Sequence, residues 1–293
     1  MRTNLLKRGL QLSIMLMATL MLTLPNVHAQ EKSGITISHP PRIAIVIDDL
    51  GSQLELGLKS ISIPRRGPIT YAVIPYTPYA KRLSKVAYDQ GNEVILHMPM
   101  EPIGHFNPHQ GMLMHAMQRD DIVHQLRRAI DEIPFASGFN NHMGSLFTQT
   151  PHLMQWLMHE VSLNTSLFFL DSRTSPKSVA YETAKGLGIP TLKRDVFLDS
   201  VKSVAFVEKQ FAKLLNVALQ QGHAIGIGHP YPETLVVLEK YLPTLHELGF
   251  ELVSLSDILS SPSSIPYQYL AKTEELLPAA NTTPPAHTNE HSH

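Results

Sequence analysis

The chain has 293 residues, 43% of them hydrophobic and 17% charged, which is enough for one large α/β domain, or two small ones, with a buried core. The formal net charge of −1 offers no basic field to nucleic acid, which argues against that class of partner. Cysteine is absent, so disulfides, thiolate nucleophiles and cysteine metal sites are excluded, and any metal ion must be held by His, Asp or Glu.

The first residues of the chain, 1–29, have the pattern of a secretory signal peptide. Basic residues precede an apolar stretch over 10–24, and the Val-His-Ala sequence at 27–29 matches a small-x-small cleavage site. The apolar stretch is shorter than the about 20 residues that a membrane-spanning helix needs. We therefore expect a secreted protein of the bacterial periplasm or cell envelope, without a stable membrane span after cleavage. An uncleaved anchor is the alternative.

A predicted linker, residues 30–41, leads to the stretch Arg-Ile-Ala-Ile-Val-Ile-Asp-Asp-Leu-Gly at 42–51. Its consecutive apolar and mostly β-branched residues predict a strand that is buried on both faces of a parallel sheet. Adjacent strand residues point to opposite sides, so Asp48 and Asp49 are expected to be aimed differently, one at a cation and one at a substrate. The alternative is a turn in which an aspartate caps the next helix.

Strands and helices then alternate without interruption to about residue 260. This alternation predicts repeated βα units, and hence one α/β domain over 42–260 with a parallel sheet or barrel. The segment over 98–118, which carries several Met and His residues such as His109, is expected to be a functional or mobile loop. Residues 261–293, rich in Ser, Pro, Thr and Asn, are predicted to be a disordered tail. Further strands are expected at 69–74, 93–96, 136–141, 166–170, 189–192, 223–227 and 250–255.

Acidic and imidazole side chains recur at one kind of place, the carboxyl end of a predicted strand. In a barrel these ends converge on one face. Two histidines and a carboxylate form an open site for Zn²⁺ or a similar divalent cation, which activates water and polarises a carbonyl. A second carboxylate can accept the proton of that water, and a further histidine can protonate a leaving group, which suits hydrolysis of an amide or ester. The strand-end residues are Asp48, Asp49, His97, His142, Asp171 and His229.

A glycoside hydrolase on a similar barrel is an alternative interpretation of the same residues. Such an enzyme needs two acids that flank the glycosidic bond, and Asp48 and Asp171 are the candidates. The histidines would then have no task, which makes this alternative the weaker one.

Five short motifs lie at or near these strand ends. They are Ile-Val-Ile-Asp-Asp-Leu-Gly (45–51), Leu-His-Met-Pro-Met-Glu-Pro (96–102), Gly-Phe-Asn-Asn-His-Met-Gly-Ser (138–145), Phe-Phe-Leu-Asp-Ser-Arg-Thr-Ser (168–175) and Ile-Gly-Ile-Gly-His-Pro-Tyr-Pro-Glu-Thr (225–234). Together they resemble the divergent polysaccharide deacetylase family, a distant branch of the NodB-type carbohydrate esterases. The resemblance spans about residues 40–258. It implies a distorted (β/α) barrel of about seven parallel strands, and a metal-dependent deacetylase of an N-acetylated polysaccharide or peptidoglycan.

The resemblance also implies individual roles for the matching residues. Asp48 matches the catalytic base, Asp49 and His97 match metal ligands, and His229 matches the general acid. The metal is expected to be Zn²⁺. The Arg-Pro-Pro-Tyr type motif of ordinary deacetylases is missing, so polar contacts to the glycan are expected from other residues. The candidates are Glu101, Asn141, Asp171 and Arg173, together with Asn140.

The second metal histidine departs from the family pattern. NodB-type enzymes have His-x-x-x-His, and the fourth residue after His97 is Glu101. Either Glu101 or His142, from the next strand, completes the ligand set. We prefer His142, because nearby prolines disfavour a helical pair at 97 and 101 and because imidazole suits a borderline-soft metal.

A catalytically inactive envelope factor that binds glycan or protein on the same barrel is the competing hypothesis. It predicts that Asp48→Asn preserves function in cells while variants of surface residues do not.

Overall fold

The computed structural model describes residues 40–260 of the chain. The predicted signal peptide at 1–29, nearly all of the predicted linker and the predicted tail at 261–293 lie outside the described residues. Within residues 40–260, no helix combines the length and the apolar character needed to cross a membrane.

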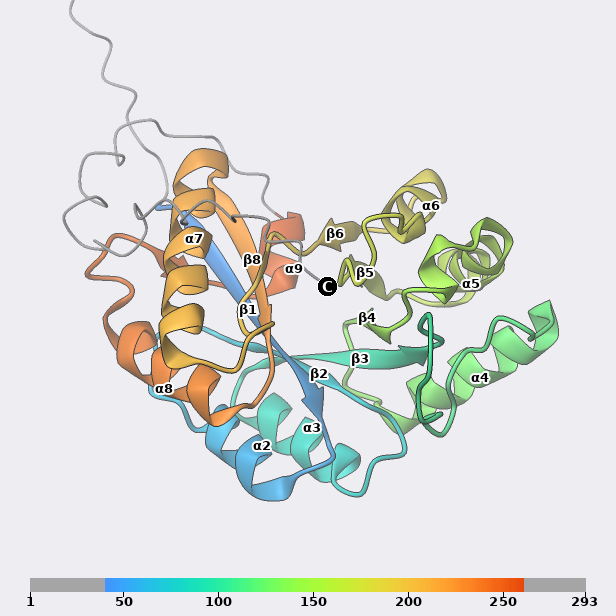
Figure 1. Ribbon diagram of the computed structural model, residues 1–293, viewed down its shortest axis with the longest axis horizontal. Helices are drawn as coiled ribbons and strands as arrows, with labels where there is room; N and C mark the ends of the chain where they lie inside the picture. Colours follow the sequence, from blue (N-terminus) through green and yellow to red (C-terminus); the bar gives the residue numbers. More distant parts are fainter. Residues whose placement is uncertain (1–39, 261–293) are drawn as a thin grey trace, which may run out of the picture. The chain divides into compact units, whose positions relative to one another are not determined.

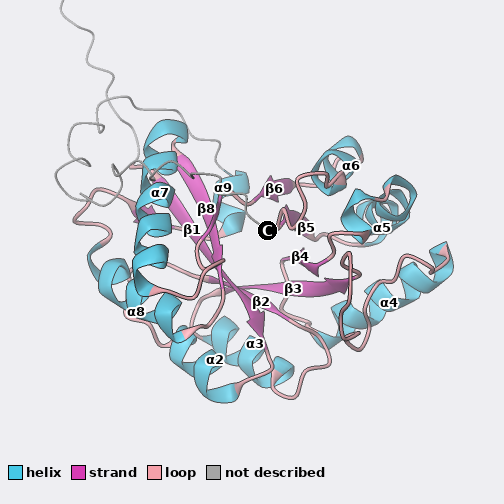
Figure 2. Ribbon diagram, viewed as in Figure 1, coloured by secondary structure: helices cyan, strands magenta, loops and turns pink. Residues whose placement is uncertain are grey.

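A parallel sheet of nine strands forms the centre of the described region (Figure 1). Its main path runs β6-β5-β4-β3-β2-β1-β8-β7, and β9 pairs with the start of β1. The sheet curves into an open half-barrel with most helices on its outer side (Figure 2). The strands are β1 (Arg42–Leu50), β2 (Thr70–Val73), β3 (Glu93–Met100), β4 (Gly138–Met143), β5 (Phe168–Asp171), β6 (Thr191–Lys193), β7 (Val196–Phe197), β8 (His223–Gly228) and β9 (Glu251–Leu252).

The helices follow the strands in regular alternation, as expected of βα units. Among them, α9 lies on the inner side of the curved sheet (Figure 1), whereas the longer helices cover the outside. They are α2 (Leu54–Ile61), α3 (Ala80–Asp89), α4 (Arg119–Glu132), α5 (Pro151–Asn164), α6 (Ala180–Gly186), α7 (Val204–Gln221), α8 (Pro232–Tyr241) and α9 (Leu255–Ser260), with short 3₁₀ turns at Phe147–Gln149 and Leu242–Thr244.

Strand β1 is buried on both of its faces, which explains why its residues are apolar without alternation. Ile43, Ile45 and Ile47 belong to the core between the sheet and the outer helices. Ala44 and Val46 belong to a second, smaller core on the inner side, which includes residues of α9. Burial on two faces fixes the strand firmly, so the residues at its carboxyl end have a rigid support.

The predicted α/β fold with a parallel sheet is confirmed, and its arrangement agrees with a distorted (β/α) barrel. The sheet has more strands than the about seven that the resemblance implies. β9 lies within the strand predicted at 250–255, whereas β7 was missed because it contains only two residues and leaves no periodic pattern in the sequence. Strand β3 also continues past the predicted end, so His97 lies inside it rather than just beyond it. His142 is likewise inside β4.

Candidate metal centre

The end of β1 is bent so that its two adjacent carboxylates face the same histidine. The pairing of β1 with β2 shifts in register between Ile47 and Leu50, and Asp49 has a φ of 61°. This left-handed conformation costs about 1–2 kcal/mol for most residues, although Asp tolerates it better. Asp48 Oδ2 lies 3.6 Å and Asp49 Oδ1 3.2 Å from Nε2 of His97. The strict alternation expected from the sequence is therefore wrong here, because a bulge interrupts the strand.

Three ligand atoms, from β1, β3 and β4, converge close to this bend. Asp49 Oδ1 is 3.2 Å from His97 Nε2 and 2.9 Å from His142 Nδ1, and the two nitrogens are 3.2 Å apart. Asp49 Oδ1 is buried and has no hydrogen-bond partner despite these short distances. Ligands about 2.0–2.1 Å from a divalent cation are separated by about 2.8–3.4 Å in octahedral or tetrahedral coordination. The triangle of Asp49, His97 and His142 therefore fits such a cation.

A hydrogen-bonded amide sets the orientation of the His97 ring. Asn140 Nδ2 donates to Asp48 Oδ1 (2.9 Å) and to Ser172 Oγ (3.1 Å), which leaves its Oδ1 as an acceptor. That oxygen lies 2.7 Å from Nδ1 of His97, so Nδ1 carries the proton. Burial tends to lower the pKa of His97, but the carboxylates of Asp48 and Asp49 outweigh burial and raise it. When His97 gives up the proton on its Nε2 to bind a cation, that nitrogen presents a lone pair to the point where Asp49 and His142 converge. Asn140 thus links the expected base to an expected metal ligand.

Burial and the concentration of charge control the electrostatics of the centre. Burial raises the pKa of Asp48, against the opposing effect of the nearby His97 and His229. Burial also tends to raise the pKa of Asp49, but the close nitrogens of His142 and His97 hold that pKa far below its usual range. Burial lowers the pKa of His142, which keeps its imidazole neutral as a metal ligand requires. Asp48 is buried and the adjacent Asp49 is partly buried, so two carboxylates side by side favour a positive charge between them, which a divalent cation would supply.

His229 lies across the centre and carries a carboxylate partner that the sequence analysis did not identify. Its Nδ1 donates to Asp199 Oδ1 (2.9 Å), its backbone N–H donates to Asp199 Oδ2 (2.6 Å), and its Nε2 lies 3.8 Å from Asp49 Oδ2. Burial alone would lower the pKa of His229, but the hydrogen bond to Asp199 and the charge of Asp48 outweigh it and raise the pKa to about 9. At neutral pH His229 is therefore a protonated imidazolium that can donate a proton.

One sequence signal pointed to Asp199. Like the residues identified in advance, it is an acid directly after a short apolar segment, Val196 to Leu198, whose first two residues form β7. The two-residue length of β7 concealed that strand.

The residues expected to contact a glycan make contacts within the protein. Asn141 donates to the Met143 carbonyl (2.8 Å) and accepts the Ser172 N–H (3.0 Å). Asp171 is fully buried and accepts the backbone N–H of Arg173 (2.8 Å). These bonds brace the loops that follow β4 and β5, so any role of these residues in binding a glycan stays a prediction.

Glu101 does not belong to the group of ligand atoms found in the described residues. Its Oε2 accepts the backbone N–H of His115, and its backbone N–H donates to the Leu113 carbonyl (2.9 Å). The geometry therefore favours His142 over Glu101 as the third ligand, and Glu101 holds the loop between β3 and α4.

A cavity of about 330 Å³ opens beside the triad. Asp49, His142 and His109 contribute its polar wall, and the remaining wall is largely apolar. Tyr231 stacks on the His229 ring, with 5.2 Å between ring centroids. The apolar lining comes mainly from Leu50, Leu56, Ile74, Met143 and Pro230.

Fold and site together define an α/β half-barrel with a candidate Asp-His-His metal centre at the carboxyl ends of its strands. The profile of the divergent polysaccharide deacetylase family matches residues 45–259, so the chain belongs to that family and the resemblance seen in its motifs is confirmed.

The chain is also similar to several uncharacterized proteins. The chain is 38% identical over 225 residues to an uncharacterized protein of Haemophilus influenzae, covering 77% of this chain and 79% of that one. It is 35% identical over 221 residues to the uncharacterized protein YibQ of Escherichia coli, covering 75% and 68%. The crystal structure of an uncharacterized protein from Agrobacterium tumefaciens shares the fold with a TM-score of 0.72 and 25% identity, covering 75% and 90%.

Proposed function

We propose that the protein is a metal-dependent hydrolase that removes acetyl groups from an envelope polysaccharide or related glycan. The observation that carries the proposal is the triad of Asp49, His97 and His142, with a buried, unpartnered carboxylate oxygen at its centre. Membership of the divergent polysaccharide deacetylase family supports the class of substrate. The donor set of two imidazoles and one carboxylate favours Zn²⁺.

The residues around the triad are suited to the two proton transfers of amide or ester hydrolysis. When bound, the cation supplies Lewis acidity toward the acetyl carbonyl. Asp48, held by Asn140, accepts a proton from the attacking water. His229, protonated through its contact with Asp199, donates a proton to the leaving nitrogen or oxygen, so that acetate and a free amine or hydroxyl result.

Features of the sequence support the cell location and the substrate that we propose. The pattern over 1–29 supports export to the periplasm or cell envelope, where acetylated glycans are available as substrates. Peptidoglycan fragments and chitooligosaccharides are therefore the first substrates to test.

Acetate release by the purified protein tests the proposal. We expect about one divalent cation per chain, from the single set of ligands, and acetate release that stops when a chelator removes it. Asp48→Asn should retain the cation and lose about 10²–10⁴-fold in rate, because only the proton acceptor is removed. A metal-loaded protein that releases no acetate from any N- or O-acetylated glycan would contradict the proposal. Full complementation in cells by Asp48→Asn would favour the inactive binding factor instead.

A further inference from the structure

A third histidine, His109, meets the candidate metal centre from the loop between β3 and α4. Its Nε2 lies 3.2 Å from Nε2 of His142, and the two rings meet edge to face with 4.8 Å between centroids. His109 is half-buried and also lines the cavity beside the triad. His109 lies outside the five sequence motifs and has no role in the proton transfers described above.

The position of the proton on His142 follows from the geometry of the triad. Nδ1 of His142 faces Asp49 Oδ1 and His97 Nε2, so as a metal ligand it must present a lone pair there. A neutral imidazole then carries its proton on Nε2, which points at His109. Nε2 of His109 is therefore the acceptor of that N–H.

The loop that carries His109 is folded against the sheet. The backbone N–H of Met112 donates to the His109 carbonyl (3.1 Å), and that of Leu113 donates to the Pro99 carbonyl in β3 (2.8 Å). Gly111 has a φ of 76° and packs on Tyr76, where an added Cβ would lie only 2.4 Å from a ring carbon. These contacts bring His109 to His142 at a defined distance.

We propose that His109 is a positioning residue of the metal centre, which fixes the tautomer and ring orientation of His142 and so strengthens metal binding. The inference rests on the metal site of the proposed function. Metal-ligating histidines usually donate their second N–H to a carboxylate, carbonyl or water, and loss of such a partner typically weakens metal binding about 10–100-fold. A histidine from a loop takes that place here, which couples the loop to the metal centre.

Metal affinity without substrate tests this role. Zn²⁺ affinity would be measured by chelator competition for the wild type, His109→Ala, His109→Gln and His105→Ala, and the visible spectrum of the Co²⁺-loaded proteins would report ligand geometry. We expect His109→Ala to weaken Zn²⁺ binding about 10–100-fold and to change the Co²⁺ spectrum. His109→Gln should restore much of the affinity, because its amide oxygen can accept the same N–H. His105 is exposed on the same loop, so His105→Ala is the matched control. It should leave the Zn²⁺ affinity and the Co²⁺ spectrum unchanged.

The possible failures are distinguishable. If the wild type holds Zn²⁺ tightly and His109→Ala holds it equally tightly with the same Co²⁺ spectrum, the positioning role is wrong and the metal centre stands. If the wild type binds neither cation, the proposed function fails and this inference fails with it. Equal losses in His109→Ala and His105→Ala would indicate a general effect of the loop and would also overturn the specific role of His109.

Discussion

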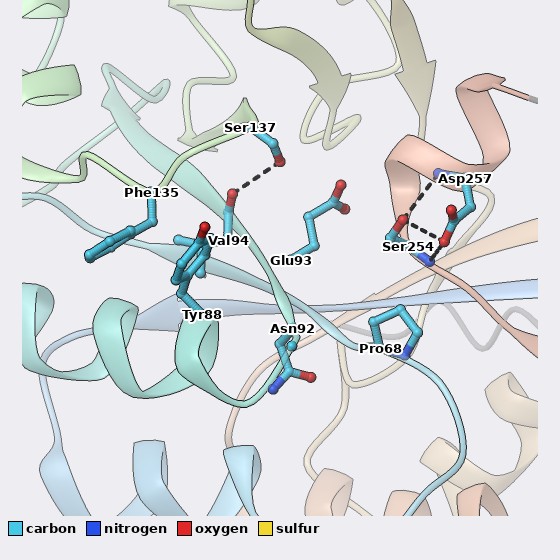
Figure 3. Close-up of a pocket in the computed structure, with 10 residues that line it drawn as sticks. Pro68, Tyr88, Asn92, Glu93, Val94, Phe135, Ser137, Ser254 and Asp257 are labelled. Carbon is cyan, nitrogen blue, oxygen red and sulfur yellow. Dashed lines mark hydrogen bonds between the residues drawn. The ribbon is translucent and has the colours of Figure 1, made fainter.

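The two ends of the half-barrel each contain a cavity of about 330 Å³, yet their polar groups differ. Figure 3 shows the cavity at the amino ends of the strands, where Ser137 donates to the Val94 carbonyl and Ser254 donates to Asp257. Glu93, in the same wall, accepts hydrogen bonds from Thr70 and from the first residues of α9. At the carboxyl ends, by contrast, a buried oxygen of Asp49 has no hydrogen-bond partner. Cavity volume does not separate the two ends, but their carboxylates do: both oxygens of Glu93 accept hydrogen bonds, whereas Oδ1 of Asp49 has no partner.

The backbone shows the same difference. The non-glycine residues with positive φ in the described region are Asp49, Tyr76, Met143 and Arg173. Each lies at or just beyond the carboxyl end of a strand, namely β1, β2, β4 or β5. Such conformations cost about 1–3 kcal/mol each and persist where the surrounding structure enforces them, often at functional sites. Backbone strain and an unpartnered carboxylate oxygen thus lie at the carboxyl ends, whereas the amino ends have the hydrogen-bonded Glu93 and an unpartnered Nε on Arg65.

Removal of a triad ligand should have the largest effect. We expect Asp49→Ala to abolish stoichiometric binding of a divalent cation, because two histidines alone leave an incomplete ligand set. Acetate release should fall with the metal content, measured by elemental analysis of the purified protein. If Asp49→Ala still binds one cation tightly, the metal site lies elsewhere, and metal binding does not distinguish the carboxyl ends of the strands from the amino ends.

The pH dependence of the reaction tests the pairing of His229 with Asp199. The proton on His229 is present below its raised pKa of about 9, so acetate release should decline as the pH rises through that value. In Asp199→Asn the stabilising carboxylate is lost, and the pKa should fall toward about 6.5, the ordinary value of histidine. The alkaline limb of the pH–rate profile should therefore move to lower pH by up to about 2.5 units, from about 9 toward about 6.5.

The comparison with the wild type must be made at equal metal content. An alkaline limb that stays unchanged in Asp199→Asn would show that His229 is not the group that titrates there.

Displacement of the His109 loop should have a smaller effect. Gly111→Ala forces a methyl group against Tyr76 and should lower metal affinity several-fold, about 1 kcal/mol, through a shift of His109. Gly104→Ala is the matched control, because Gly104 also has a positive φ but nothing lies within 4 Å of an added Cβ. Chelator competition measures both variants. If Gly111→Ala and Gly104→Ala bind the metal with equal affinity, the contact between residue 111 and Tyr76 does not determine the position of His109 at the metal centre.

At the amino ends, a substitution should change stability and leave the chemistry unaltered. Glu93→Gln places an amide N–H₂ where the structure has donors from Thr70, Leu255 and Ser256, and should cost about 1–3 kcal/mol of unfolding free energy. Urea unfolding measures this cost, and metal content and acetate release of the folded protein should match the wild type. A loss of activity beyond the loss of folded protein would show that the amino-terminal cavity takes part in function.

Much of the arrangement could be predicted from the sequence by local rules. The unbroken apolar run of β1 predicted a strand buried on two faces, and the alternation of strands and helices predicted a parallel α/β sheet. The histidines at 97 and 142 and the acids at 48 and 49 were expected at one edge because parallel strands end on the same side. The structure brings these four side chains together.

Other contacts depend on register and could not be predicted locally. Residue His97 lies beside Asn140 because β3 and β4 pair in that register, and a shift by one residue would turn one of the two side chains away. The bend at Asp49, which turns both acids toward His97, arises from a register shift between β1 and β2.

The sequence by itself determined the type of fold, the edge of the sheet where the polar residues gather, and the family to which the chain belongs. Only the tertiary structure decided which of those residues meet: Asp199 with His229, Asn140 with Asp48, and His109 with His142. The physical reason is that residue patterns specify local geometry and which face of an element is buried. Contacts between side chains 30 or more positions apart depend instead on strand pairing and loop packing, which the whole core fixes at once.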